Sequence, residues 1–394
     1  MSESVTSGAG AGWDRKRCTI LQRRMVQYRT TLFERLRDEL DGRNIDLRVV
    51  YGQPSPNDAK RNDARHLSWG DEVEARWFTV RGTELLWQPC PPDARKADLV
   101  ILQQENKILS NLPHLLRRAV GSAKLGYWGH GRNLQSTDPD GLSERMKATL
   151  ITQVDWWFAY TEQTRELLHA DRYPDERITV LDNAIDNDSF VADLAAVGDE
   201  RLDELRRRID LVPDGSLAVY CGSLYPDKRL DLLLDVARRV HEQDPSFRLV
   251  VMGDGPSRAE VEAFTEAHPW AHWVGMQTGV DKAAWFRLAK VYLSPGAVGL
   301  HVLDAFTAGV PMFTTTTALH GPEICYLENG VNGYVLEPDP ALFAKTVADV
   351  LADPDRLRSL VDAGRRSAER YTLANMLTSF ADGIEAAIAT PRLR

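Results

Sequence analysis

Short apolar runs alternate with amphipathic stretches along the first half of the chain. Apolar residues recur at helical spacing over residues 31–40, between apolar runs at 18–22 and 45–51. Apolar runs bounded by turn residues predict buried strands, and a spacing of three and four residues predicts one face of a helix. The order strand, helix, strand therefore predicts a parallel sheet with crossover helices.

The same alternation returns in the second half, with a strand predicted at 217–221, a helix at 230–242 and a strand at 247–252. Between the halves, residues 187–213 are charged and helical in character, which indicates a domain boundary. The pattern predicts an α/β protein of two Rossmann-like domains with a cleft between them. The predicted division is a disordered tail at 1–16, an N-terminal domain at 17–190 plus 372–394, and a C-terminal domain at 191–371.

Residues 293–317, LSPGAVGLHVLDAFTAGVPMFTTTT, combine a strand end, a glycine turn, a short helix and a second strand. Gly299 permits a tight turn before the helix, and Gly309 stands where a left-handed cap ends it. A helix start after a glycine turn offers N–H groups and a positive dipole end to an anion. Asp304, one turn into the helix, can reach a ribose hydroxyl, so the stretch suits a nucleotide. A plain scaffold role in a doubly wound domain stays open.

Composition narrows the class of protein. The 394 residues are 43% hydrophobic and 27% charged, and the net charge of −9 argues against a nucleic-acid surface. No apolar run approaches the roughly 20 residues of a membrane span. The four cysteines form no CxxC pair and no metal-ligand cluster, which indicates reduced thiols in the cytoplasm. Contact with the inner face of a membrane stays open.

Polar residues at the ends of the N-terminal strands are candidates for acceptor binding, because ligands bind at the carboxyl ends of parallel strands. The competing role for Tyr28 and Arg29 is to pack against and cap the following helix, and for Arg24 and Arg132 it is ordinary solvation. His130 lies between two glycines, which lets both imidazole and backbone approach a ligand. The acceptor candidates are Arg24, Gln27, Tyr28, Arg29, Asn106, Arg132 and Asn133.

Polar residues also follow the strands of the C-terminal half. Lys228 stands at the mouth of the helix at 230–242, where an ammonium group can neutralise a diphosphate. The backbone of Val274 and Gly275, at the end of another strand, can hydrogen-bond the edge of a base. These positions predict a nucleotide site in the C-terminal domain.

Seven segments carry a family resemblance: LDNAID, VYCGSLYPDKRLDLLL, LVVMGDGP, WVG, SPGAVGLHVLDAFTAGVPMFTT, HGPE and NGVNGYVLEPD. In this order and spacing the chain resembles the retaining, nucleotide-sugar-dependent glycosyltransferases of family 4. The resemblance implies the GT-B fold, in which two Rossmann-like domains face each other across a cleft. It also implies that the last helix crosses back to the N-terminal domain.

The resemblance implies roles for individual residues. Lys228 and the N–H groups of Gly299 and Leu300 would bind the donor diphosphate, Asp304 would bind the ribose, and His130 would lie near the transferred sugar. His130, Lys228 and Asp304 are the predicted catalytic residues. The predicted donor-binding residues are Gly222, Ser223, Lys228, Arg229, Gly253, Val274, Gly275, Gly296, Val298, Gly299, Leu300, Asp304 and Glu323.

The chain departs from the family pattern in three places. Gly296 and Asp304 stand where the family has two glutamates, and Ser223 stands where a basic residue is usual. Residues 23–29 replace the family's N-terminal glycine-rich loop. With these changes, Lys228 and Arg229 would carry more of the charge on the diphosphate side.

The expected function is a retaining, metal-independent transfer of a sugar from a UDP- or GDP-sugar to an acceptor hydroxyl of a glycan, a glycolipid or a small natural product. The nucleotide sugar is a co-substrate, and no cofactor or metal ligand is expected. The acidic residues at 138 and 140 are expected to lie in a turn. A nucleotide-sugar epimerase or phosphorylase of the same fold, and a sugar-nucleotide binding protein without catalysis, stay as alternatives. A dehydrogenase is disfavoured because no GxGxxG follows a first strand.

Overall fold

The computed structural model describes residues 15–59, 63–80, 82–121, 124–131 and 150–393. The chain folds into two compact units. Unit 1 comprises Met1–Trp128, Gln153–Trp157 and Ala381–Arg394, and unit 2 comprises Gly129–Thr152 and Phe158–Phe380. The domain boundaries expected at residues 190 and 372 stay a prediction.

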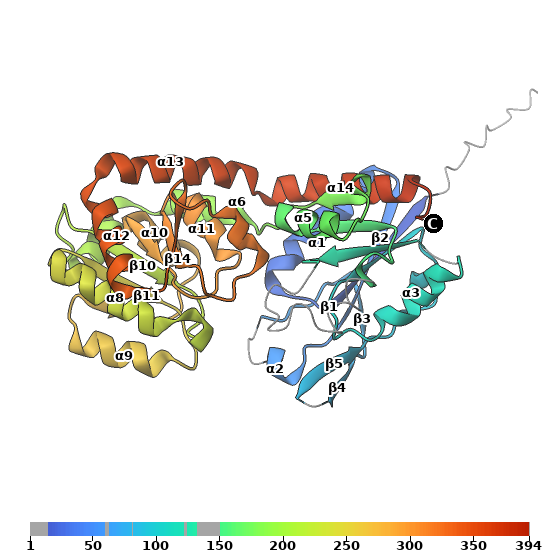
Figure 1. Ribbon diagram of the computed structural model, residues 1–394, viewed down its shortest axis with the longest axis horizontal. Coiled ribbons are helices and arrows are strands. Elements are labelled where there is room, and N and C mark those ends of the chain that lie inside the picture. Colours follow the sequence, from blue (N-terminus) through green and yellow to red (C-terminus); the bar gives the residue numbers. More distant parts are fainter. Residues whose placement is uncertain (1–14, 60–62, 81, 122–123, 132–149, 394) are drawn as a thin grey trace, which may run out of the picture. The chain divides into compact units, whose positions relative to one another are not determined.

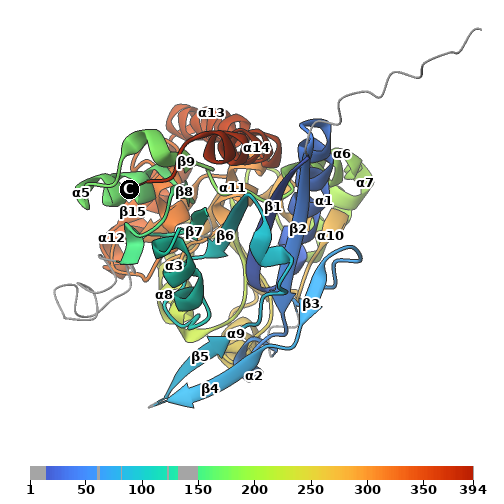
Figure 2. The same cartoon turned by 90° about the vertical axis from the view of Figure 1, so that its right-hand side faces the viewer.

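The first sheet has the strand order β3-β2-β1-β6-β7-β8-β9 (Figures 1 and 2), and the pairs from β3 through β7 are parallel. Successive strands are therefore added on one side of β1 up to β3, and on its other side from β6 onward. Its strands are β1 (Lys16–Arg24), β2 (Ile45–Gly52), β3 (Asp71–Val73), β6 (Leu99–Gln103), β7 (Leu125–Gly129), β8 (Trp156–Ala159) and β9 (Ile178–Val180). The associated helices are α1 (Gln27–Gly42), α2 (Pro56–Ala59), α3 (Asn111–Ala119), α5 (Glu162–Ala170), η1 (Ala94–Lys96) and η2 (Asp175–Arg177).

The first elements are longer than the sequence predicts. The strand expected at 18–22 extends over Lys16–Arg24, and the helix expected at 31–40 covers Gln27–Gly42. Residues 23–29 are therefore a strand end and a first helical turn rather than an open connection. Polar residues extend the strand because its backbone pairing with β2 continues to Arg24, although the apolar pattern has already stopped.

An antiparallel ribbon interrupts this unit before β6. It consists of β4 (Arg76–Val80) and β5 (Thr83–Trp87), which form a separate two-stranded sheet. In the sequence, the ribbon lies between β3 and β6. Figure 2 shows it at the edge of the first unit, next to α3.

The second sheet is parallel throughout and has the order β12-β11-β10-β13-β14-β15. Renumbered from its first strand this is 3-2-1-4-5-6, the order of a dinucleotide-binding Rossmann domain. The strands are β10 (Leu217–Cys221), β11 (Arg248–Met252), β12 (Ala271–Trp273), β13 (Val291–Leu293), β14 (Met312–Thr315) and β15 (Gly333–Leu336). The helices are α6 (Asn187–Ala196), α7 (Asp199–Arg208), α8 (Leu230–Gln243), α9 (Arg258–Ala267), α10 (Gly279–Leu288), α11 (His301–Ala308), α12 (Pro340–Ala352), α13 (Pro354–Arg370), η3 (Pro226–Lys228) and η4 (Pro322–Tyr326).

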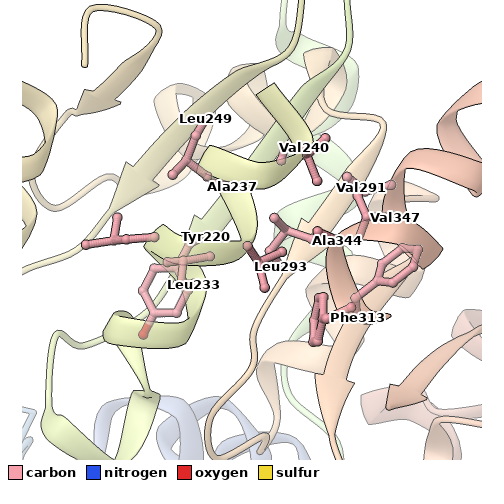
Figure 3. Packing of buried hydrophobic residues seen from close by; sticks show 14 of the residues in the cluster. Tyr220, Leu233, Ala237, Val240, Leu249, Val291, Leu293, Phe313, Ala344 and Val347 are labelled. Atoms are coloured by element: carbon pink, nitrogen blue, oxygen red, sulfur yellow. The ribbon is translucent and has the colours of Figure 1, made fainter. Parts of the chain in front are cut away.

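A buried apolar cluster fixes one face of the second sheet. Leu233 and Val240 on α8, Val347 on α12, and Leu249 and Phe313 from the strands are fully buried and pack together (Figure 3). Both faces of parallel strands are buried, which explains the continuous apolar runs in the sequence. The rigid sheet holds the loops at its carboxyl edge in fixed positions.

The last helix, α14 (Leu373–Ala389), begins in unit 2 and ends in unit 1. Within unit 1, Lys124 donates to the carbonyls of Ala387, Ile388 and Thr390 at 3.0, 2.7 and 2.8 Å. A lysine at these carbonyls satisfies the groups that a helix C-terminus leaves without partners. The helix that the resemblance implies is thus present.

Across the described residues, no helix combines the length and apolar character needed to cross a membrane. All four cysteines are free thiols.

Gly253 should not tolerate a side chain. Its φ is +142°, and a Cβ atom there would lie 1.8 Å from the carbonyl oxygen of Gly222. We expect Gly253→Ala to lower the free energy of unfolding by about 2 kcal/mol or more, because backbone on both sides must move. Gly198→Ala is the matched control, since nothing lies within 4 Å of its Cβ position. Equal melting temperatures for the two variants would contradict this account.

Candidate active site

The loops after β10 and β13 meet where the strand order of the second sheet reverses. A Cβ on Gly296 would lie 2.3 Å from the backbone of Lys228, so only glycine fits this contact. Ala297 N–H donates to the carbonyl of Asp227 at 3.0 Å, and Lys228 Nζ donates to the carbonyl of Ala297 at 2.5 Å. Ligands of open α/β sheets bind at such a reversal. The structure therefore brings the predicted residues Lys228 and Gly296 together.

Side chains from neighbouring segments hold the loop at 295–298. Thr315 Oγ1 donates to the carbonyl of Pro295 at 2.7 Å, and Thr314 Oγ1 donates to that of Gly296 at 3.3 Å. His320 accepts from Val298 N–H through Nδ1 at 3.1 Å, so Nε2 carries the proton and donates to the Thr315 carbonyl at 2.6 Å. These bonds fix the path of the chain into α11.

The start of α11 is open toward a ligand. In the part of the chain that the structure describes, the N–H groups of Gly299 and Leu300 have no protein acceptor. The Cβ position of Gly299 has no atom within 4 Å, so a ligand can approach the backbone there. Two N–H groups at the positive end of a helix dipole favour an anion.

Lys228 supplies a cation to the same group of loops. Burial lowers its pKa, while Asp227 acts in the opposite sense. One of its three ammonium donors binds the carbonyl of Ala297, which leaves two for an anion. Arg229 instead pairs with Asp231 at 3.0 Å, and Ser223 is exposed. Lys228 is therefore better placed than Arg229 to replace the basic residue that the chain lacks at 223.

Asp304 forms an ion pair that the sequence did not predict. Lys282 on α10 lies with its Nζ 2.8 Å from the Asp304 carboxylate, and the two side chains are 19% and 12% exposed. Burial raises the pKa of Asp304, and Lys282 opposes this rise. Lys282 belongs to none of the motifs. In the sequence it is an ordinary helical lysine, because it meets Asp304 only through the packing of α10 against α11.

The backbone end of β12 is already partly engaged. Val274 donates to Val251 at 3.1 Å and accepts from Gln277 Nε2 at 2.6 Å, while Gly275 accepts from Gly253 at 2.9 Å. Among the described residues, the N–H of Gly275 has no acceptor. Of the four backbone groups predicted to contact a base, this N–H is the one left for a ligand.

His130 and Glu323 are connected through Asn183 within unit 2. The His130 ring contacts Tyr160 edge to face at 4.4 Å between centroids, and Asn183 N–H donates to the Tyr160 carbonyl at 2.8 Å. Asn183 Nδ2 donates to Glu323 Oε1 at 2.6 Å, and Tyr326 donates to the Asn183 carbonyl at 3.1 Å. The Oδ1 atom of Asn183 is buried without a partner among the described residues. Asn183 occurs in the LDNAID segment, but its role as a connector could not be predicted.

The predicted acceptor residues of unit 1 differ in their surroundings. Arg24 pairs with Asp63 at 2.6 Å and is 7% exposed, and Gln27 accepts from Arg65 at 2.9 Å. Arg29 lies over the Trp128 ring at 4.1 Å, whereas Tyr28 and Asn106 are exposed. The candidates Arg132 and Asn133 lie outside the described residues.

The two doubly wound sheets and the returning helix define the GT-B fold, as the sequence predicts. Solved structures of other proteins have the same fold. HepE of Anabaena, in complex with UDP, matches with a TM-score of 0.68 and 12% identity over 94% of this chain and 99% of that one. A putative UDP-N-acetylglucosamine 2-epimerase of Listeria monocytogenes matches with a TM-score of 0.63 and 13% identity over 97% and 100%. At these identities the likeness shows the fold alone.

Sequence comparison supports the resemblance. Residues 215–353 match the family described as "Glycosyl transferases group 1". A D-inositol 3-phosphate glycosyltransferase of Thermobispora bispora is 25% identical over 264 residues, which cover 62% of this chain and 57% of that protein. The chain spans about half the length of the curated relatives it matches. The predicted similarity to glycosyltransferases is confirmed.

Among the described residues, no group of three or more His, Cys, Asp or Glu side chains is arranged to hold a metal ion. The turn expected at 138–140 lies outside them. Metal independence stays a prediction.

Replacing Lys282 should make nucleotide binding depend on pH. In Lys282→Met, Asp304 loses the cation that opposes the effect of burial, so its pKa rises further. The carboxylate then becomes protonated at a higher pH than in the wild type, so on acidification UDP or GDP affinity falls at a higher pH than it does in the wild type. Calorimetric titration measures this shift, with Lys345→Met as the control because Lys345 pairs with Asp349 on the surface. Parallel pH profiles for both variants would exclude a role for Lys282.

Restoring the family's first glutamate should damage the site. In Gly296→Glu the new side chain meets the Lys228 backbone, which must move together with Asp227. We expect nucleotide affinity to fall at least about tenfold, which corresponds to roughly 1.4 kcal/mol. Fluorescence titration with UDP and GDP checks this. An unchanged or tighter complex would show that the loop adapts without cost.

Proposed function

We propose that the protein is a retaining glycosyltransferase that moves a sugar from a UDP- or GDP-sugar to an acceptor hydroxyl. The observation that carries this proposal is the meeting of Lys228 with the loop that leads into the open start of α11, where two N–H groups are available. Similarity to group 1 glycosyltransferases supports it, as do neighbours whose solved structures contain UDP or UDP-glucose. Glycan, glycolipid or natural-product biosynthesis is the proposed context.

In the proposed reaction, the bond between the anomeric carbon and the diphosphate oxygen breaks while an acceptor oxygen bonds to the same face. The departing diphosphate gains negative charge, which Lys228 and the N–H groups of Gly299 and Leu300 stabilise. Asp304 binds the ribose and fixes the nucleotide, so the leaving oxygen is held at the helix start. The acceptor proton passes to the departing phosphate. No protein nucleophile and no metal are required.

His130 and Glu323 are proposed to contact the transferred sugar. Glu323 is 5% exposed, and its Oε1 accepts from Asn183. A buried carboxylate with a fixed orientation can accept a hydrogen bond from a sugar hydroxyl with little loss of side-chain freedom. His130 is exposed, and its edge-to-face contact with Tyr160 orients the ring. The remaining donor-site candidates, Val298 and Gly222, would shape the backbone.

An epimerase remains the second candidate, since the solved structures of this fold include a putative UDP-N-acetylglucosamine 2-epimerase. The two reactions differ in their need for an acceptor. An epimerase converts the donor into an isomeric nucleotide sugar without any acceptor, whereas a transferase releases nucleoside diphosphate. A protein that only binds the donor would do neither. We further propose a cytoplasmic location, which the four free thiols support.

The first test is thermal stabilisation by nucleoside diphosphates and their sugars. A ligand at about 100 times its dissociation constant adds roughly 2.7 kcal/mol of stability. We expect one nucleotide series to stabilise the wild type, and Lys228→Ala to weaken that nucleotide about 10- to 100-fold, as for the loss of charge-assisted hydrogen bonds. Lys345→Ala is the control for a lysine outside the site.

Slow hydrolysis of the donor releases a free sugar, and proton NMR identifies its anomer. The first anomer to appear shows whether the reaction retains or inverts the configuration. An α-linked donor should yield first the α anomer if the reaction retains configuration, and EDTA should leave the rate unchanged. Release of the β anomer would overturn the retaining mechanism, and loss of activity in EDTA would overturn metal independence. If nothing stabilises the wild type, the donor-site proposal itself fails.

A further inference from the structure

Three hydrogen bonds within unit 2 fix the main chain and the side chain of Asn183, which is 2% exposed and lies between β9 and α6. Its N–H donates to the carbonyl of Tyr160 at 2.8 Å, and its carbonyl accepts from the Tyr326 hydroxyl at 3.1 Å. Its side-chain Nδ2 donates to Glu323 Oε1 at 2.6 Å. An amide held in this way can set the orientation of the carboxylate that it binds.

The carboxylate of Glu323 decides which way round the Asn183 amide lies. An ionised carboxylate only accepts hydrogen bonds, so the amide nitrogen faces Glu323 and the amide oxygen points away. That oxygen, Oδ1, is buried without a partner among the described residues. A buried acceptor without a partner costs free energy and is rare in folded proteins. The cost is explained if the bond from Nδ2 to Glu323 serves the site.

Gly321 places the second carboxylate oxygen of Glu323 beside the start of α11. The Cβ position of Gly321 lies 2.7 Å from Glu323 Oε2 and 3.6 Å from the Cα atom of Gly299. Gly321 N–H donates to the carbonyl of Val298 at 2.7 Å, which holds the two segments together. Oε2 therefore lies near the glycine where a ligand can approach the backbone.

We propose that Asn183 is a positioning residue for the donor sugar: its amide turns Glu323 so that Oε2 accepts a hydrogen bond from a hydroxyl of the transferred sugar. With Oε1 bound to Asn183, the carboxylate does not have to be ordered when the sugar arrives. The nucleoside diphosphate is bound by other groups, so its affinity should not depend on Asn183. This inference rests on the proposed donor site.

Comparing each nucleotide with its sugar separates positioning from support of the fold. Calorimetric titration of the full chain compares UDP with UDP-glucose and GDP with GDP-mannose. In Asn183→Asp the amide donor is lost and a second carboxylate faces Glu323. At about pH 8 we expect the affinity for the nucleotide sugar to fall at least about tenfold relative to that for the free nucleotide, as for the loss of a hydrogen bond to a charged group.

Asn187→Asp is the matched control. Asn187 is also buried, at 7% exposed, but its Nδ2 donates to the main-chain carbonyl of Tyr371 at 3.2 Å and not to a carboxylate. We expect this variant to keep the wild-type ratio between nucleotide-sugar and nucleotide affinity.

A proton can replace the lost bond in Asn183→Asp. Two carboxyl groups at hydrogen-bond distance share a proton as the pH falls, because both cannot ionise readily. The relative loss should therefore shrink between about pH 8 and 5.5, whereas the ratio for Asn187→Asp stays flat. Burial raises the pKa of Cys325 to about 11 and also raises the pKa of Tyr326, so neither neighbour titrates in this range. Asp182, whose pKa burial also raises, is present in both variants.

Exchanging the two side chains should restore the bond with its direction reversed. In Asn183→Asp/Glu323→Gln the glutamine amide donates to the aspartate, and the glutamine oxygen takes the place of Oε2. We expect the preference for the nucleotide sugar to recover at least about threefold over Asn183→Asp at about pH 8. Gly321→Ala should lower the same preference without a change at 183, because the new Cβ displaces Oε2 while the φ of −70° at 321 suits alanine.

Thermal melts of each variant show whether it folds, and Gly321→Ala keeps the test open if Asn183→Asp does not. Equal losses of nucleotide and nucleotide-sugar affinity in Asn183→Asp would show that Asn183 only supports the fold. An unchanged ratio in both Asn183→Asp and Gly321→Ala would also overturn the proposal. A wild type that binds none of the four ligands is a different result, since the donor site itself then fails and the role of Asn183 falls with it.

Discussion

The second unit of this protein depends on backbone segments that approach one another more closely than side chains allow. Gly253 meets Gly222, and Gly296 meets Lys228, at distances that leave no room for a Cβ atom. Through these two contacts, the loops after β10, β11 and β13 lie against one another at the carboxyl edge of the sheet. The ammonium group of Lys228 and the loop into α11 lie together because of this approach.

The same constraint changes the meaning of a departure from the family pattern. Glycine in place of a glutamate suggests a lost function when only the sequence is compared. In the structure, Gly296 is the residue that lets the β13 loop lie against Lys228, and the carbonyl of Ala297 then binds the lysine. The carboxylate that remains, Asp304, is neutralised by Lys282. The charge of the site is thus rearranged among residues that motif comparison alone would not group.

The order of strands and helices could be predicted because apolar periodicity and glycine punctuation report local structure directly. The β10–β15 sheet and the turn into α11 follow this rule. Lys282 and Asn183 could not be predicted as site residues, because each acquires its partner from a segment distant in sequence. Arg24 shows the opposite case. As an arginine at a strand end it is predicted to bind the acceptor, but in the structure it is paired with Asp63. Ion pairing across a fold depends on tertiary packing, which no local pattern encodes.

The loop at 295–298 is anchored by its own carbonyls and N–H groups to Thr314, Thr315 and His320. The groups that would face an anion at Gly299 and Leu300 are again main-chain N–H groups. Recognition by main chain is insensitive to the identity of the side chain at Leu300, which is only partly buried. A mutational scan of residues 295–300 would therefore be uneven: Gly296, which has no room for a Cβ atom, would be intolerant, and Leu300 at the helix start would be permissive. Such unevenness would let a sequence diverge far while the backbone N–H groups at the helix start keep their positions.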